Sequence, residues 1–330
     1  MPLIVDFIDR QFIHNNPPAP TASFKGRIAI VTGSNVGLGR EAARMMVRLG
    51  ASQVIIACRN VEKGKLAAKD IQSTTGCSPD TVKVWQLDMG SYNSVIAFAD
   101  RVRTELRRLD ALAANAGIGT LKFKLTEDNE ETITTNVVSM SLLACLVYPK
   151  LRATALEFNT YTHFTVTGSE LFEFAKFRER KAPAGKIFTT LADESKSHMS
   201  DRYDTSKLLA MMVVKQLAAM APIDSNKVIV NCVAPGFCQS ELFRDYSGGA
   251  VRVMKKILGR PTEVGARTIV HGTCAGPESH GQYVPDCKIK PTGGLTKGKK
   301  GAELQNRVWA ELKQKLEGFQ PGVTSLGFEA

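Results

Sequence analysis

Tyr203 and Lys207 are the two side chains of this sequence whose types and spacing most clearly suggest chemistry. They open an apolar run, residues 208–214, that is typical of a helix, and residues four apart on a helix share one face. A phenol beside a fixed ammonium loses its proton more easily than its solution pKa of about 10 allows. Tyr203 is therefore a candidate general acid near neutral pH. A tyrosine and a lysine four residues apart also occur by chance, as a half-buried ring beside a solvated neighbour. The rest of the sequence must therefore decide whether this pair is catalytic.

The elements that could position this pair come from a chain able to bury a large core. Its 330 residues are 43% apolar, which suits one large α/β domain or two smaller ones. The longest apolar stretch, residues 142–148, is too short to cross a bilayer, and Asp6 and Asp9 argue against a secretory signal. Seven cysteines without a Cys-x-x-Cys favour reduced thiols and no metal site. These features predict a cytoplasmic protein without an integral membrane span.

The formal charge of +11 admits nucleic acid, an anionic membrane or an anionic small molecule as a partner. The basic residues are spread along the chain, and no basic stripe alternates with aromatic residues. One short cluster lies at Lys297, Lys299 and Lys300. We therefore expect a solvated basic surface and no nucleic-acid partner.

A glycine-rich turn follows the first β-branched stretch. Residues 27–31 are typical of a buried strand, residues 40–49 of a helix, and TGSNVGLG (32–39) lies between them. Strand, turn and helix form the context that a dinucleotide fingerprint needs, in which the glycines allow a tight turn, a close pyrophosphate and close helix packing. A glycine turn without a ligand is the less favoured interpretation. We expect cofactor contacts from the whole turn: Gly33, Ser34, Asn35, Val36, Gly37, Leu38 and Gly39.

Three further strands are expected over residues 53–58, 82–87 and 111–114, with helices over 61–73 and 91–107. These strands end, in order, at Arg59, Asp88 and Asn115. A guanidinium at the end of the second strand suits the 2′-phosphate of NADP, whereas a carboxylate there would hold the ribose of NAD. Asp88 is placed to bond an adenine edge. The alternative for Arg59 is an ordinary exposed arginine.

Strands that alternate with helices predict βαβ units and a parallel sheet. Ligands of such folds bind beyond the carboxyl ends of the strands, which is where Gly33, Arg59, Asp88 and Asn115 all fall. We therefore expect the α/β class: a single doubly wound Rossmann-like domain, with a parallel sheet of about seven strands and helices on both faces.

The motifs in this order resemble the short-chain dehydrogenase/reductase family. They are TGSNVGLG (32–39), LDM (87–89), NAG (115–117), Asn136, Ser169, YDTSK (203–207) and Pro235-Gly236. The resemblance spans residues 25–290. Within the family the chain is similar to the retinol-dehydrogenase-like branch, through ACRN (57–60) and YVPDC (283–287), and to fungal natural-product reductases.

The resemblance implies four catalytic residues. Ser169, after a strand over 162–167, would donate to the substrate carbonyl and stabilise charge on its oxygen. Tyr203 would supply the proton, and Lys207 would lower the pKa of Tyr203 and bond the nicotinamide ribose. Asn136 would hold a water that links Lys207 to solvent.

Two of these four roles have competitors. Ser195, Ser197 and Ser200 compete with Ser169, which is preferred because it directly follows a strand. Asn136 could instead be a helical residue, within 126–148, that bonds only backbone. The remaining NADP(H) contacts implied by the resemblance are Ala116, Gly117, Pro235, Gly236 and Ser240, the last in place of the family's threonine.

Several segments depart from the family's pattern. Gly168 stands where serine is commoner, and Ala114 replaces an asparagine. The interval 170–202 is longer than usual, and we expect this insert to form one wall of the substrate pocket through Phe172, Phe174, Phe177 and Phe188. The alternative is a surface flap whose phenylalanines cover the core.

The ends of the chain and one loop complete the domain plan. Residues 240–260 resemble the family's mobile substrate loop, with an apolar content that favours a hydrophobic carbonyl compound. Residues 1–24 are expected to be an appendage whose short helix packs back onto the body. In 291–330, a Gly/Lys-rich link is expected to lead to one helix, 301–316, and then a loose tail.

The sequence as a whole favours an NADPH-dependent reductase, or the reverse dehydrogenase, for a hydrophobic ketone or aldehyde in secondary metabolism. The alternative is a catalytically silent NADP-binding scaffold or sensor. The resemblance also implies a homodimer or homotetramer.

Overall fold

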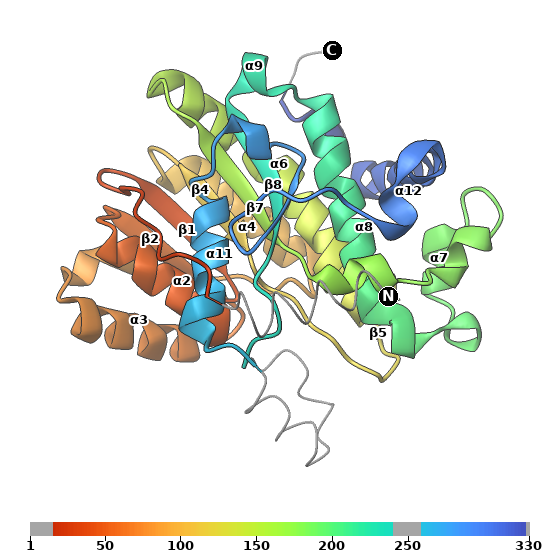
Figure 1. Cartoon of the computed structure of the whole chain (residues 1–330), viewed down its shortest axis with the longest axis horizontal. Helices are drawn as coiled ribbons and strands as arrows, with labels where there is room; N and C mark the ends of the chain where they lie inside the picture. The colour runs from red at the N-terminus through yellow and green to blue at the C-terminus, as the bar shows by residue number, and fades with distance from the viewer. Residues whose placement is uncertain (1–15, 240–258, 328–330) are drawn as a thin grey trace.

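Seven parallel strands form the sheet around which the chain folds (Figure 1). The structure is a computed structural model, and it describes residues 16–239 and 259–327. The strands run in the spatial order β3-β2-β1-β4-β7-β8-β9, so the order reverses between β1 and β4. Their bounds are β1 Ile28–Thr32, β2 Gln53–Cys58, β3 Val82–Gln86, β4 Ala111–Ala114, β7 Thr162–Thr167, β8 Val228–Ala234 and β9 Tyr283–Pro285. The expected doubly wound α/β fold is confirmed.

Helices cover both faces of this sheet (Figure 1). One face is packed by α2 (Gly37–Arg48), α3 (Val61–Thr75) and α11 (Thr262–Gly272), and the other by α4 (Tyr92–Glu105), α6 (Ser139–Glu157) and α8 (Met199–Met220). Every residue of β4, β7 and β8 is buried. β4 and β8 are accordingly nearly continuous apolar runs, as expected for strands covered on both faces, whereas β7 has three threonines and a histidine among its six residues.

The shorter elements lie mostly between β4 and α8. A two-stranded antiparallel ribbon, β5 and β6, precedes a short helix and one π-helical turn, and four short helices occupy the insert. The bounds are β5 Leu125–Thr126, β6 Asn129–Glu130, α5 Glu131–Ile133, η3 Thr134–Val138, η4 Glu170–Phe174, η5 Arg178–Lys181, α7 Ile187–Leu191 and η6 Glu194–Lys196. Elsewhere they are η2 Pro79–Thr81, α9 Ile223–Asn226, η7 Pro277–Ser279, η8 Gly294–Thr296 and η9 Val323–Ser325.

A C-terminal helix, α12 (Gly298–Phe319), packs on the outside of α8 through Val308, Trp309, Leu312 and Leu316, which are all buried. The loose tail expected after this helix is wrong for residues 320–327. Glu317 accepts hydrogen bonds from the backbone of Gly322 and Thr324, and Leu326 is 1% exposed. The carboxylate and the buried leucine therefore hold the end of the described chain against the body.

The helix that contains α6 is the most apolar of the described chain. The stretch Glu131–Glu157 is long and apolar enough to cross a membrane by length and composition, but 89% of its most apolar window is buried inside the fold. This burial is typical of a core helix of a folded domain.

The N-terminal appendage is described only from residue 16 onward, so its expected short helix lies outside the described residues. Arg267 of α11 donates to Asn16 Oδ1 at 2.8 Å and to the Pro17 carbonyl at 3.0 Å, and Phe24 is fully buried. Residues 16–24 thus lie against the body of the domain.

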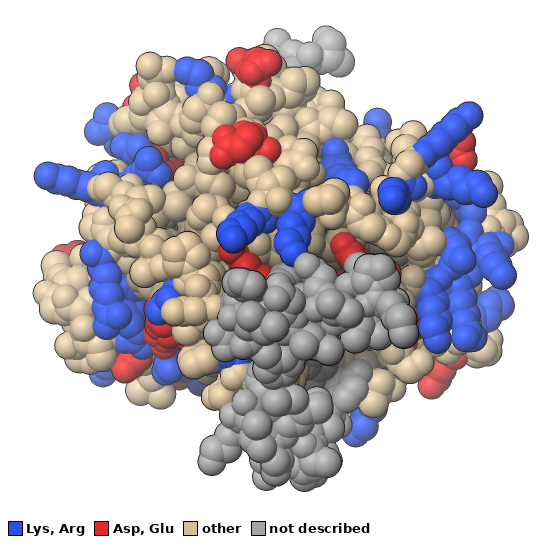
Figure 2. All heavy atoms as spheres, viewed as in Figure 1, with Lys and Arg blue, Asp and Glu red and all other residues tan. Residues whose placement is uncertain are grey.

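Basic side chains are scattered over the face shown in Figure 2, with a denser group on the side where α7 and α12 lie. The exposed basic residues of the insert and of the start of α12 include Lys176, Arg178, Lys181, Lys186, Lys297, Lys299 and Lys300. The two segments touch, because Arg307 donates to the Arg180 carbonyl at 2.8 Å.

Candidate active site

A cavity of about 290 Å³ opens beyond the carboxyl ends of the strands. Residues that follow six of the seven strands line it, as expected for a ligand site at the point where strand order reverses. Most of the expected cofactor residues lie there: Gly33, Asn35, Val36, Gly37, Leu38, Gly39, Arg59, Asp88, Asn115, Ala116, Gly117, Pro235 and Gly236. Two of the four candidate catalytic residues, Tyr203 and Lys207, line the same cavity.

The glycine turn has the backbone that its sequence indicates. Gly33 has φ +64°, and a Cβ there would lie 2.9 Å from Ala116 Cα. Gly37 has φ +59° and would meet nothing within 4 Å, so open space lies in front of its backbone. The N-terminus of α2 has no side-chain cap and no acidic residue in its first turn. Its N–H groups are therefore available to an anion.

Ser34 is the member of the turn that faces away from the cavity. It is fully buried, and its hydroxyl donates to the Val31 carbonyl at 2.5 Å. In this orientation the Ser34 side chain cannot make the cofactor contact expected of it.

Thr32 and Asn115 tie the ends of β1 and β4 together. Thr32 Oγ1 accepts from Ala116 N at 2.9 Å, and Asn115 Nδ2 donates to the Thr32 carbonyl at 3.0 Å. A Cβ on Gly39 would lie 2.6 Å from Asn115 Nδ2, so the third glycine leaves room for this amide. Thr32 was not among the expected site residues, although a threonine at a strand end is a usable signal.

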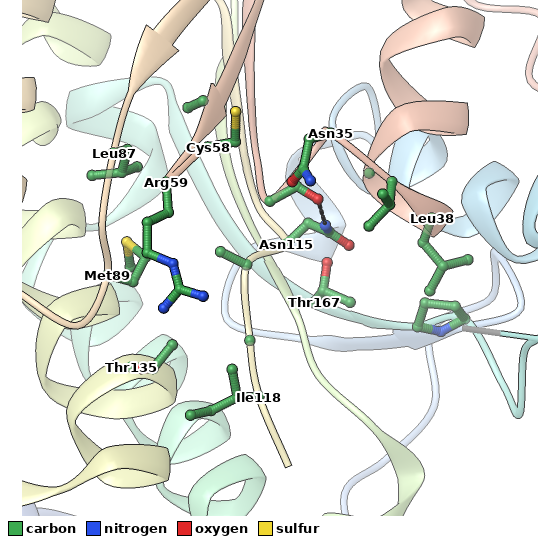
Figure 3. A pocket seen from close by; sticks show the side chains of 18 of the residues that line it. Asn35, Leu38, Cys58, Arg59, Leu87, Met89, Asn115, Ile118, Thr135 and Thr167 are labelled. Carbon is green, nitrogen blue, oxygen red and sulfur yellow. Dashed lines mark hydrogen bonds between the residues drawn. The ribbon is translucent and has the colours of Figure 1, made fainter. Parts of the chain in front are cut away.

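Arg59 and Asp88 lie on one side of the cavity. The exposed side chain of Arg59 extends from the end of β2 into the cavity, beside Met89 (Figure 3). No carboxylate of the described residues forms an ion pair with it. Asp88 Oδ1 accepts from Gly90 N at 2.9 Å, which fixes the carboxylate at the end of β3.

Tyr203 and Lys207 lie on one face of α8, as their spacing predicts. Tyr203 is 7% exposed, and Lys207 Nζ lies 5.5 Å from the centroid of its ring. Nζ donates to the Thr167 carbonyl at 2.8 Å. Burial lowers the pKa of Lys207 to about 8. The ammonium and the phenol ring therefore lie beside each other at the cavity.

Asn136 lies in the π-helical turn η3 and is 3% exposed. Its Oδ1 accepts from Ile118 N at 2.9 Å, and its Nδ2 donates to the Ile118 carbonyl at 2.8 Å and to Ser206 Oγ at 3.0 Å. The side chain therefore holds the strand-end segment after β4 against α8. Its expected role with a water molecule stays a prediction.

Ser169 does not line this cavity, whereas its neighbours Thr167 and Gly168 do. Its Oγ accepts from Leu171 N at 3.3 Å and caps η4. Thr167 Oγ1 is buried and has no hydrogen-bond partner among the described residues.

The unusual Gly168 has a structural reason. A Cβ at this position would lie 2.5 Å from Cys232 Sγ on the neighbouring strand β8. The sulfur thus occupies the space that a larger residue at 168 would need, and the two positions form a matched pair.

The turn after β8 is held from beneath by a buried ion pair. Arg260, 3% exposed, donates to the Pro235 carbonyl at 3.1 Å and pairs with Asp286. Gly236 has φ +77°, and a Cβ there would lie 2.6 Å from Arg260 Nη1. This pair was not foreseen from the sequence.

Residues 237–239 and 259–260 pair with each other. Arg260 N donates to the Phe237 carbonyl at 2.8 Å, and Gln239 N donates to the Arg260 carbonyl at 3.0 Å. We call this pairing the neck. Ser240 and the substrate loop from 240 to 258 lie outside the described residues.

The insert contributes no residue to the cavity lining. Phe172, Phe177 and Phe188 are buried in the core, whereas Phe174 is 40% exposed. Three of the four phenylalanines thus fit the alternative, a flap that covers the core, and the wall prediction now depends on Phe174.

The sequence matches the family model described as short chain dehydrogenase over residues 27–156. The chain is 46% identical over 310 residues to the short chain dehydrogenase/reductase dmxR8 of Cryptosporiopsis sp. (strain 8999), covering 93% of this chain and 96% of that protein. It is 36% identical over 316 residues to the short-chain dehydrogenase anuD of Penicillium roqueforti, covering 93% and 82%.

Solved structures share the fold. An NADP active-site complex of Pseudomonas aeruginosa RhlG matches with a TM-score of 0.60 at 23% identity, covering 81% of this chain and 97% of that one. The 3-ketoacyl-(acyl-carrier-protein) reductase of Brucella melitensis, complexed with NADH, matches with a TM-score of 0.57 at 18% identity, covering 80% and 97%. At these identities the likeness shows the fold alone.

Proposed function

The chain belongs to the short-chain dehydrogenase/reductase family of oxidoreductases, and from that premise we propose that it is an NADPH-dependent reductase of a hydrophobic ketone or aldehyde. The observation that carries this proposal is the meeting of Tyr203, Lys207 and the glycine turn in one cavity. The reverse reaction, oxidation of the corresponding alcohol, uses the same groups.

The residues around the cavity fit a dinucleotide. The uncapped start of α2 and the open backbone at Gly37 suit a pyrophosphate. Arg59, with no ion-pair partner among the described residues, suits a 2′-phosphate. The complex of RhlG with NADP is in keeping with this choice, although a structure of the same fold also carries NADH. Arg59 therefore supports NADP(H) over NAD(H).

When bound, the cofactor supplies a hydride from its nicotinamide ring to the carbonyl carbon. In our proposal Tyr203 gives its phenolic proton to the carbonyl oxygen. Ser169 directly follows the lining residue Gly168, and its Oγ accepts from Leu171 N, so in our proposal its own hydroxyl proton is donated to the same carbonyl oxygen. Lys207, whose Nζ is fixed on the Thr167 carbonyl, keeps the phenol acidic enough to act near neutral pH. Asn136 holds the Ile118 segment and provides for return of the proton through a water.

The first test is Tyr203→Phe. This change keeps the ring that packs near Lys207 and removes only the proton donor, so we expect carbonyl reduction to fall by about 10²–10⁴-fold. NADPH affinity, measured by fluorescence of the bound nicotinamide, should change little. A variant that turns over at a rate near that of the wild type would refute the proposed reaction.

The second test is Arg59→Asp, which addresses cofactor choice. A carboxylate would repel the 2′-phosphate and accept from the ribose hydroxyls of NADH, so we expect kcat/KM for NADPH to fall and that for NADH to rise. Arg48→Asp makes the same charge change at an exposed site outside the cavity lining and serves as the control. An unaltered ratio of the two kcat/KM values in Arg59→Asp would mean that Arg59 does not contact the phosphate.

The substrate class is proposed from three features. The expected substrate loop is rich in apolar residues, Phe174 is partly exposed beyond the end of β7, and the similar proteins dmxR8 and anuD come from fungi. They favour a hydrophobic, ring-bearing carbonyl compound of secondary metabolism. Product analysis with NADPH and a panel of polyketide, terpenoid and retinoid carbonyls would identify it, and cofactor binding without turnover would favour a silent scaffold or sensor.

The setting of the protein is proposed as cytoplasmic. The burial of the apolar helix Glu131–Glu157 is compatible with a soluble domain. A homodimer or homotetramer, implied by the family resemblance, stays a proposal.

A further inference from the structure

A fully buried arginine, Arg202, directly precedes Tyr203 in α8. Its Nε lies 3.6 Å from Glu130 Oε2, and its Nη2 lies 3.6 Å from Glu179 Oε1. Nη2 also donates to Ser197 Oγ at 3.1 Å. Removing a guanidinium from water is costly even when carboxylates surround it, so this charge is kept against an energetic penalty. Burial lowers the pKa of Arg202 and raises the pKa of Glu130, which shows that penalty on both partners.

Glu130 connects Arg202 to the segment that carries Asn136. Glu130 Oε1 accepts from Thr132 N and Thr132 Oγ1, each at 2.9 Å, and Oε2 accepts from Ile133 N at 3.3 Å. It is the N-cap of α5, which runs directly into the π-helical turn η3. The carboxylate that faces Arg202 therefore also determines where this turn begins.

The segment 130–136 and helix α8 are joined at two points. Glu130 faces Arg202, and Asn136 Nδ2 donates to Ser206 Oγ at 3.0 Å. Positions 202 and 206 lie one helical turn apart, and the candidate catalytic residues Tyr203 and Lys207 each follow one of them. The phenol thus lies on a turn of helix that is fixed at both ends to the same neighbouring segment.

The insert holds the same turn from its other side. Asp201 accepts from Lys176 N and Phe177 N, both at 2.9 Å, and from Thr205 Oγ1 at 3.0 Å. Glu179, 5% exposed, follows within the same part of the insert and faces Arg202. Carboxylates from two elements, Glu130 and Glu179, therefore converge on one guanidinium.

We propose that Arg202 is a positioning residue, held between Glu130 and Glu179, that fixes the direction of the Tyr203 hydroxyl relative to Lys207 Nζ. We call Arg202, Glu130 and Glu179 the clamp. The insert then acts on catalysis by supplying Glu179 to the clamp. The inference rests on the proposed function, because it needs Tyr203 to be the proton donor. A small displacement of a reacting group can reduce the rate by about 10²-fold, so a loose clamp has a measurable consequence.

The experiment compares Arg202→Met and Glu179→Gln with a matched control, Asp110→Asn. Asp110 is also a buried carboxylate in an ion pair, with Arg108, and it accepts from Ile28 N at 2.8 Å. It lies at the amino ends of β1 and β4, whereas the cavity lies at the carboxyl ends of the strands. Each variant is assayed for kcat, KM, NADPH affinity, thermal stability and the pH dependence of kcat, with the carbonyl substrate found in the product screen.

We expect both clamp variants to lose roughly 10-fold to 100-fold in kcat with NADPH affinity unchanged. The alkaline limb of their pH profile for reduction should move to higher pH, because a phenol farther from Nζ holds its proton more tightly. Asp110→Asn should lower thermal stability and leave kcat and the pH profile unaltered. A purely structural ion pair would not move the pH profile.

Two results would overturn the inference. One is a wild-type kcat and pH profile in folded Glu179→Gln. Because this variant keeps Arg202 and Glu130, it still tests the inference in the case that Arg202→Met does not fold. The other is an equal loss of kcat in Asp110→Asn, which would indicate general loosening. Failure of the proposed function is separate, because it would show as near-normal turnover in Tyr203→Phe.

Discussion

Lys207 is a cation in the interior of the domain, and we propose that it lies there to assist proton transfer by Tyr203. It is 6% exposed, its Nζ has the Thr167 carbonyl as its hydrogen-bond acceptor, and the nearby Cys232 is itself buried with its pKa raised to about 12, so that the thiol is neutral. No carboxylate contributes to the shift of the Lys207 pKa to about 8. This burial lowers the stability of the cofactor-free fold, a cost that the proposed proton transfer by Tyr203 would explain.

We expect Lys207→Met to stabilise the cofactor-free protein at pH 7 by about 1–3 kcal/mol while abolishing reduction. The folded pKa lies below the ordinary lysine pKa of 10.5, so the unfolded chain binds the proton more tightly. Wild-type stability should therefore rise with pH between about 8 and 10.5, and the variant should lack that contribution. Denaturant unfolding at several pH values measures the difference. Equal pH dependence in the two proteins would contradict the burial argument.

At the scale of residues, the sequence predicted positions that depend on local structure. All strands of a parallel sheet have their carboxyl ends on the same side, so residues that follow these strands can be predicted to lie together from the order of elements alone. This is how the sequence brought together Gly33, Arg59, Asp88 and Asn115, which all line the cavity. The pairings of Gly168 with Cys232 and of Arg260 with Asp286 join residues far apart in the sequence. No periodicity encodes such contacts, which is why they were found only in the structure.

At the scale of elements, the insert differs most from its sequence interpretation. Its aromatic residues suggested a pocket wall, yet Phe172 meets Tyr283 edge-on at 5.0 Å and Phe177 is fully buried. A phenylalanine has the same pattern in a wall and in a core, so composition could not separate the two. Deleting 176–186 would remove Glu179 as well, and a single substitution is the sharper test.

Phe174→Ala is that substitution. Because Phe174 is 40% exposed and η4 follows the cavity-lining end of β7, we expect KM for the carbonyl substrate to rise several-fold with little change in thermal stability. Leu66→Ala, at a residue of α3 that is 67% exposed, is the control for loss of an exposed apolar side chain. An unchanged KM would leave the insert without a role in the pocket wall.

The strands expected over 27–31, 53–58, 82–87, 111–114 and 162–167 and the helices α3 and α4 were predicted to within two residues, whereas α6 and α8 end well beyond the stretches expected for them. α2 begins at Gly37 rather than Arg40, since glycine at its first turn disguises a helix. The stretch read as one helix over 126–148 is instead β5, β6, a short helix, the π-helical turn and α6. A π-helical turn has no compositional signature, so its position at Asn136 could not be foreseen.

At the scale of the whole molecule, α12 and the insert determine which surfaces remain open. Glu311 of α12 accepts from the backbone of Gly185 and Ile187, and Arg307 donates to the Ala182 and Pro183 carbonyls. With α12 in place, α8 is buried along most of its length. Copies of the chain therefore lack an exposed apolar face on the described part of α8 through which to pair.

We expect Leu156→Arg on α6 and Ala219→Arg on α8, both at exposed positions, to leave the mass in solution unchanged. If these two helices formed an interface between copies, a buried charge there would dissociate it. Light scattering on the wild type and both variants measures the mass. A mass of half or a quarter of the wild-type value in either variant would show that copies of the chain pair through these helices.

The neck has a consequence for how such an enzyme could change its preferences. Residues 237–239 and 259–260 are bonded to each other and anchored by Arg260 on Asp286, independently of the length of chain between them. The entropy cost of closing a chain segment between two fixed ends rises only slowly with its length. Insertions and replacements between residues 239 and 259 should therefore have little effect on stability. If this segment contacts the substrate as proposed, natural selection could exchange it, and with it the compounds accepted, while the cofactor side of the cavity is inherited intact.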